Sequence, residues 1–216
     1  IARLRKDVDW RGPSWRSEVE AILRQEMVAF VATYEVIGEP ALVEYADKRQ
    51  PGRLADEFRG IVANSPYLAR VSPELALHLL RYPHVKSPAT DDFIYWSKDA
   101  FGLKPVVSIS HVSIHQPTDH RNTTIGASKQ IYASHYFLAS LSLTFATDLP
   151  PAEGRPSILL VYVNRTRVDN IQGFLGGVRR SIVRGRTEDG VAGTLEALKR
   201  RLEADPGGAG RAPATS

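Results

Sequence analysis

The amino-acid sequence predicts an α+β protein in which helices come first, an antiparallel β-meander follows, and a long C-terminal helix packs on the sheet. Three observations predict this class. Apolar residues recur at helical spacing before the meander, alternate with polar residues over Lys104–Phe145, and return to helical spacing after Gly173. Segregated helices and strands are typical of α+β folds. We therefore expect a helical region at 1–103, a sheet with its helix at 104–204 and a flexible tail at 205–216.

Length and composition limit the kind of protein. The 216 residues are enough for one substantial core, and no apolar run approaches the ~20 residues that span a bilayer. The absence of cysteine excludes disulfides and thiolate chemistry. A net charge of +4 falls short of a basic nucleic-acid-binding surface, so we expect no nucleic acid as a partner. Because the chain begins with Ile1 rather than Met, we expect a processed or truncated product that has lost any targeting segment.

The helical region shows clear start and stop signals. Ser17 and Glu20 have capping-box spacing ahead of an apolar stripe that ends at Gly38. Ser72, followed by proline and glutamate, predicts the N-terminus of a helix that runs to about Tyr82. Further helices are expected at 41–49, at 53–63 and, with Thr90-Asp91-Asp92 as its cap, over DFIYWSKDAF, where a strand is the alternative because the aromatic and β-branched residues favour sheets.

Period-two alternation predicts the strands. Residues 104–116 form a first run, and Thr123–Phe145 form a second run with apolar residues on one face and polar residues on the other. The second run is far longer than a typical strand, so we expect a bend or a bulge within it. SILLVYV at 157–163 is a continuous apolar run, which predicts a strand buried on both faces.

The second half of the chain carries a resemblance. Strands from about Lys104 to Val168, followed by a helix to Glu203, resemble the C-terminal part of START-like domains, also called helix-grip or Bet v 1-like domains. That resemblance implies a curved antiparallel sheet that grips a long helix around an apolar cavity, and it implies no catalytic set. The segments YWSKDAFGLKP, SKQIYASHYF and VYVNRTR are also similar to stretches of exported bacterial proteins without an established activity, which implies a periplasmic location.

The six histidines raise the question of a metal site. His111 and His115 lie four apart in an expected strand, which puts them on one face but about 13 Å apart at ~3.3 Å per residue. His135 could approach either one by strand pairing, but no suitably spaced Asp or Glu completes a ligand set. We therefore expect no metal, and hydrogen-bonded histidines in the sheet. The sequence also lacks a G-x-S-x-G elbow, a P-loop and a dinucleotide fingerprint, so we expect no catalytic residue and no cofactor.

Arginines gather around the start of the terminal helix. Such a group suits a phosphate, a carboxylate or anionic lipid headgroups at a membrane surface. A solvated helix face is the alternative that the sequence favours. The candidate residues are Arg165, Arg167, Arg179, Arg180 and Arg184.

Aromatic and polar residues of the strands are what a ligand cavity needs, although a helix-covered core would use the same ones. The candidates are His111, Tyr132, His135, Tyr136 and Tyr162. We expect a non-catalytic protein that binds an apolar small molecule, such as a lipid or an isoprenoid, between the sheet and the terminal helix. The alternative is a structural or accessory subunit docked on a larger, membrane-associated protein assembly, which the basic helix and the tail suit.

Overall fold

The computed structural model describes residues 6–45, 52–99, 104–120, 122–152, 155–168, 193, 195–197 and 199–200. The long helix α2 (Trp15–Ile37) leads into the 3-10 turn η1 (Glu39–Ala41) and the two-residue strands β1 (Glu44–Tyr45) and β2 (Gly52–Arg53), which pair with each other. Three short helices follow: α3 (Leu54–Ala63), α4 (Pro66–Val71) and α5 (Pro73–Arg81). The main sheet contains β3 (Thr90–Asp99), β4 (Val106–His115), β5 (Thr123–Ala133), β6 (Phe137–Ala152) and β7 (Arg155–Val168).

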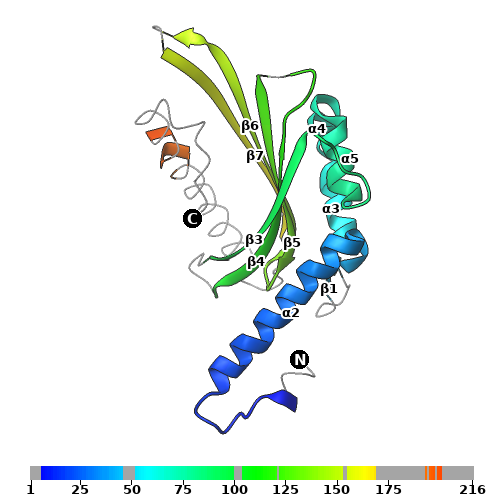
Figure 1. Ribbon diagram of the computed structural model, residues 1–216, viewed down its shortest axis with the longest axis vertical. Helices are drawn as coiled ribbons and strands as arrows, with labels where there is room; N and C mark the ends of the chain where they lie inside the picture. The colour runs from blue at the N-terminus through cyan, green and yellow to red at the C-terminus, as the bar shows by residue number, and fades with distance from the viewer. Residues whose placement is uncertain are drawn as a thin grey trace, which may run out of the picture.

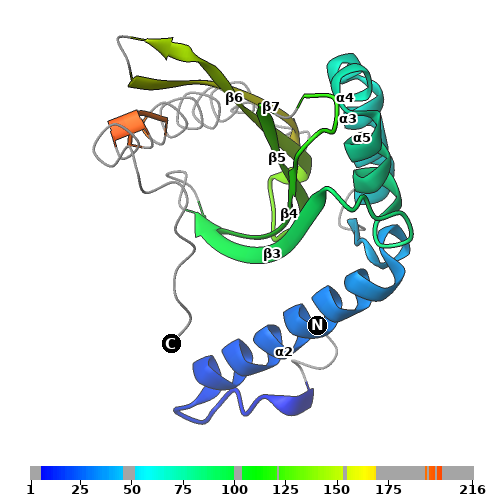
Figure 2. The same ribbon diagram turned by 45° about the horizontal axis from the view of Figure 1, so that its top comes forward.

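The sheet is an antiparallel meander with its strands in chain order, β3-β4-β5-β6-β7. Figure 1 shows α3, α4 and α5 stacked against one face of this curved sheet, with α2 extending away from it. In Figure 2 the sheet bends away from these helices, so they cover its convex face. We call the opposite side the concave face.

The register assigns each side chain to a face. Because paired residues in adjacent strands point the same way, one row runs across the whole convex face. This row contains Ile94, His111, Lys129, Leu141 and Arg165. The neighbouring convex row runs from Asp92 through Ser113, Ala127 and Leu143 to Val163. Polar and ionisable groups therefore gather at Asp92, His111, Ser113 and Lys129, on β3 to β5, and the residues of β6 in these rows are apolar.

The main core lies between the convex face and helices α3–α5. Leu54 and Phe58 of α3 and Leu75 and Leu79 of α5 are almost entirely buried, and they join Leu141 of the sheet in one apolar cluster. Removing this much apolar surface from water is the main stabilisation of the contact. The helices and the sheet therefore share one core. The segment 1–103, which was expected to be helical, also contains the strand β3 of the main sheet.

The end of α2 lies in close contact with the end of α5 at a glycine. Gly38 has φ +66°, and a Cβ at this position would overlap the carbonyl oxygen of Tyr82. One turn earlier, the ring of Tyr34 stacks on the ring of Tyr82 with centroids 5.4 Å apart. These contacts place Tyr34, which is completely buried, over the convex face near Ile109 of β4.

Several sequence predictions are confirmed. The first helix ends at Gly38, a helix covers residues 54–63, and the Ser72 side chain accepts a hydrogen bond from the N–H of Leu75 as an N-cap should. The meander and the α+β class are also as expected. Of the predicted terminal helix the structure describes only residues 193, 195–197 and 199–200, which are helical. The rest of that helix and the predicted tail lie outside the described residues, and so does the predicted packing of the helix on the sheet.

Other predictions are wrong. The segment 41–49 begins with the end of η1 and with β1 rather than a helix, and the short helix α4 at Pro66–Val71 was not predicted. Thr90–Asp99 is a strand, so the alternative interpretation is the right one and Asp92 is not a helix cap. The long second run contains a chain reversal at residues 134–136, where Tyr136 has φ +68°, instead of a bend within one strand. The run at 157–163 lies in the sheet's last strand, with Ile158, Leu159 and Val161 exposed.

A buried polar cluster as the candidate functional site

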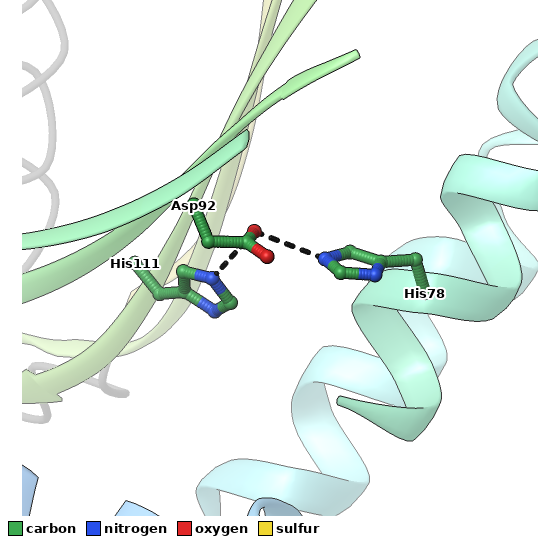
Figure 3. A group of neighbouring side chains, drawn as sticks. All are labelled: His78, Asp92 and His111. Carbon is green, nitrogen blue, oxygen red and sulfur yellow. Dashed lines mark hydrogen bonds and ion pairs between the residues drawn. The ribbon is translucent and has the colours of Figure 1, made fainter. Parts of the chain in front are cut away.

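Three polar side chains converge on one carboxylate oxygen beneath the convex face. Oδ1 of Asp92 accepts hydrogen bonds from Nε2 of His111 at 2.9 Å, from Nε2 of His78 at 3.0 Å and from Oγ of Ser113 at 2.7 Å. Figure 3 shows the two imidazoles approaching Asp92 from the sheet and from α5. Both histidines are essentially inaccessible, whereas the Asp92 side chain retains 19% of its exposure. The cluster therefore has one side that faces solvent.

Local structure explains why these groups meet. His111 and Ser113 lie two residues apart in β4 and so share the convex face. Asp92 is the cross-strand partner of Ser113, which places its carboxylate beside both of them. His78 belongs to the buried stripe of α5, where Leu75 and Leu79 anchor the helix on the sheet. Apolar packing of the helix thus holds His78 over the carboxylate.

Tyr34 extends the cluster to α2. Its hydroxyl lies 2.9 Å from Nδ1 of His111. A carboxylate only accepts hydrogen bonds, so Nε2 of His111 carries a proton toward Asp92. In neutral His111 the other nitrogen is then an acceptor, and Tyr34 donates to it. Burial raises the pKa of Tyr34 well above its ordinary value, and this keeps the hydroxyl protonated as a donor.

The hydrogen bonds decide the charge of Asp92. Desolvation alone would raise the pKa of this carboxyl group, but the bonds from His111, His78 and Ser113 outweigh it and hold the pKa well below its usual range. Asp92 is therefore an anion at neutral pH. Nδ1 of His78, on the far side of its ring, is buried and has no hydrogen-bond partner in the described part of the chain.

A buried lysine lies next to this cluster. Lys129 pairs with His111 across the strands, and its Nζ donates to the carbonyl oxygen of Leu79 at 2.8 Å. In a continuous helix the N–H four residues later would take this bond, but that residue is Pro83, which has none. The ammonium group also lies 4.3 Å from the ring centroid of Phe58. Desolvation lowers the pKa of Lys129 to about 8.

The structure separates the residues that the sequence grouped as a ligand site. His111 and Tyr132 both face the helices, where Tyr132 packs beside Phe30 of α2 after a β-bulge between Ile109 and Ser110 shifts the register. Tyr162 lies on the concave face. His135 and Tyr136 occupy the turn between β5 and β6 and contact each other.

The predicted anion-binding arginines are only partly described. Arg165 and Arg167 belong to β7 and face the helices, whereas Arg179, Arg180 and Arg184 lie outside the described residues. The guanidinium of Arg165 lies 6.0 Å from the ring centroid of Tyr67, and Nε of Arg167 lies 3.6 Å from a carboxylate oxygen of Glu57. Both described arginines therefore have partners within the protein.

Two residues of this cluster, His78 and Asp92, are not among the metal ligands that the sequence suggested. His111 was expected to lack an acidic partner, but Asp92 and His78 complete a set whose nitrogen and oxygen atoms all lie within 4.8 Å of one another. His78 is hidden among the apolar residues of α5. The strand interpretation of Thr90–Asp99 was the one signal that could have brought Asp92 to His111.

The concave face has a different chemistry, which changes across the sheet. Two rows cross it, one from Phe93 through Val112, Ser128 and Ser142 to Asn164, and one from Asp91 through Ile114, Gly126 and Thr144 to Tyr162. In these two rows the apolar side chains lie on β3 and β4, beside the carboxylate of Asp91, and hydroxyl and amide groups lie on β6 and β7. In the polar half, Oγ of Ser142 accepts from the hydroxyl of Tyr162 at 3.0 Å and from Nδ2 of Asn164 at 2.8 Å.

Comparisons with known proteins identify no similar protein. No protein-family model, no curated protein and no solved structure matches this chain. None of the described helices has both the length and the hydropathy needed to cross a membrane.

Proposed function

We propose that the chain is a non-catalytic binding protein that holds an amphipathic small molecule with a long apolar part, such as a lipid or an isoprenoid, on the concave face. The observation that supports this proposal is the difference between two halves of this face: an apolar half at β3 and β4, which also contains Asp91, and a hydroxyl and amide half at β6 and β7. Phe93 and Tyr95 are 52% and 45% exposed, and Val112 lies beside Phe93. Burial of these side chains against an acyl or isoprenoid chain would stabilise the complex, and the hydroxyls of β6 and β7 would hydrogen-bond a polar end.

The convex face supports this choice by exclusion. The space between the convex face and the helices is filled by side chains of α3–α5, as the completely buried Leu54, Leu75 and Leu79 indicate. A ligand of several carbon atoms has no room there without repacking. In our proposal the helix that the sequence predicts after Gly173 closes the ligand against the concave face. Export to the periplasm is proposed on the resemblance alone.

The proposal is tested with a fluorescent fatty acid and a panel of long-chain alcohols. The purified chain should bind the probe with one site, and the alcohols should displace it. Phe93→Ser removes part of the apolar half, and losing the burial of about half a phenyl group should weaken binding by about 1 kcal/mol, or fivefold. Tyr67→Ser is the matched control, because Tyr67 is 49% exposed in α4 on the helical layer. No saturable binding, or equal weakening in both variants, would refute the proposal.

A second candidate function is that of an accessory subunit. The far end of the β6–β7 hairpin carries apolar side chains in water: Leu149, Ile158 and Leu159 are 42–49% exposed. A cluster of this kind suits contact with another protein of a larger, membrane-associated assembly. Native mass spectrometry of the protein purified from its source distinguishes the two functions, because a co-purifying lipid supports the first and a stoichiometric polypeptide supports the second.

A further inference from the structure

We propose that His78, Asp92 and His111 form a binding site for one divalent transition-metal ion of the zinc class. Two imidazole nitrogens and one carboxylate oxygen from three different elements, α5, β3 and β4, meet within 4.8 Å. This is the donor set of zinc sites that keep an exchangeable position, which have three protein ligands and a water. Two histidines and a carboxylate also suit cobalt and ferrous iron.

The distances are close to those that a metal requires. With metal–ligand bonds of about 2.0–2.1 Å, tetrahedral ligand atoms lie about 3.3 Å apart. The two nitrogens lie 2.9 and 3.0 Å from Oδ1 of Asp92, so each has to move away from this oxygen by a few tenths of an ångström. The three ligand atoms lie within 4.8 Å of one another, so the two nitrogens have to approach each other by at most about 1.5 Å. Figure 3 shows both imidazole Nε2 atoms directed at the carboxylate. Their lone pairs would therefore point into the same small volume once the protons have left.

Neighbouring residues hold the ligands in position. Ser113 donates to Asp92 at 2.7 Å, and Tyr34 lies 2.9 Å from Nδ1 of His111. When the metal takes Nε2, neutral His111 carries its proton on Nδ1, and the Tyr34 oxygen becomes the acceptor. Hydrogen bonds of this kind fix the ring orientation in metal sites. His78 and His111 are held by packing, since both are buried in the core.

The partial exposure of Asp92 gives the ion access. Its side chain is 19% exposed, whereas the two imidazoles are 1% exposed or less. A metal therefore enters past the carboxylate at the β3 edge and keeps one position for water. The site lies on the convex face, so it is independent of the small molecule that we propose for the concave face.

The test uses the full chain after treatment with EDTA. Added Co²⁺ should produce intense visible absorption bands of a tetrahedral site with a stoichiometry of one, and Zn²⁺ should abolish them. Asp92→Asn and His78→Gln should each weaken Zn²⁺ binding more than tenfold in calorimetric titration. His84→Gln is the matched control, because His84 is exposed beyond the end of α5, and it should bind like the wild type.

A second measurement covers the case in which a variant does not fold. Nitrogen-15 NMR of wild-type imidazoles should show Zn²⁺ shifting Nε2 of two histidines and leaving the other four unchanged, and the melting temperature should rise. If Zn²⁺ instead shifts only exposed histidines, or if wild-type Co²⁺ spectra remain those of the hydrated ion, the proposal is overturned. In that case the cluster is a hydrogen-bonded contact between α5 and the sheet.

Discussion

Replacing Lys129 by Met should change the pH dependence of stability more than stability itself. The substitution removes a buried ammonium group and keeps an unbranched apolar stem in contact with Phe58. Two opposing effects follow at neutral pH. The variant no longer has to desolvate a charge, but it leaves the carbonyl oxygen of Leu79 without the donor at 2.8 Å that replaces the missing N–H of Pro83.

The two effects on the Lys129→Met variant are of similar size at pH 7. The pKa of Lys129 falls from 10.5 in an exposed lysine to about 8 in the fold. At 1.36 kcal/mol per pKa unit, keeping this charge buried at pH 7 costs about 3 kcal/mol. An unsatisfied buried carbonyl costs about 1–3 kcal/mol. The two effects nearly cancel, so at pH 7 the variant and the wild type should differ by less than about 2 kcal/mol.

The sign of the pH effect follows from the lowered pKa. Between pH 8 and 10.5 the unfolded wild type binds more protons at Lys129 than the folded protein does, so wild-type stability rises with pH relative to the variant. Above this window the amine is neutral in both states and only the carbonyl effect persists. The free energy of unfolding of the variant minus that of the wild type should therefore fall by about 3 kcal/mol across the window.

Urea unfolding of both proteins at several pH values, in EDTA, measures this difference. Ionisation of tyrosines affects both proteins alike and cancels in the subtraction. Lys98→Met, at an exposed position of β3, is the matched control and should show a nearly constant difference. A constant difference for Lys129→Met as well would refute the conclusion that this ammonium group is buried as a charge.

Three further predictions concern backbone, cluster and cap, and each is read from the urea midpoint. Gly38→Ala should destabilise the protein by more than about 2 kcal/mol, because the left-handed conformation and the close carbonyl oxygen of Tyr82 both oppose a Cβ. Gly60→Ala is the control, because nothing lies within 4 Å of the added carbon, and it should stabilise the protein by about 0.5–1 kcal/mol. Tyr34→Phe should cost about 1–3 kcal/mol by leaving the buried Nδ1 of His111 without a partner. Ser72→Ala should cost about 1 kcal/mol through the lost cap of α5, and an unchanged midpoint would contradict that role.

The sequence was informative where structure is local. Capping at Ser72, the stop at Gly38 and the alternation of β4 and β5 depend on residues a few positions apart, and the structure confirms them. Alternation also put His111 on the face that became buried. The tight turn at Tyr136 was less visible, because the alternation continues in phase through it and resembles one long strand.

The candidate site was not predictable from the sequence, because it depends on contacts that no local pattern encodes. Asp92 reaches His111 through the pairing of two strands, and His78 reaches Asp92 through the packing of α5 on the sheet. A similar limit explains the wrong prediction for residues 157–163. A continuous apolar run has the same pattern in a central strand and in β7, which is last in the sheet order, because strand order is a property of the whole fold.

The β6–β7 hairpin extends past the end of β5, and this has a consequence for local motion. Beyond Asp148, the described residues of β6 pair with β7 alone, whereas the middle of β6 is paired on both sides. A two-stranded ribbon is marginally stable by itself. Amide hydrogens near Leu149 should therefore exchange with solvent by local opening, many times faster than those near Leu141, without unfolding of the core. The part of the β6–β7 hairpin beyond Asp148 can therefore change its contacts while His78, Asp92 and His111 stay in place.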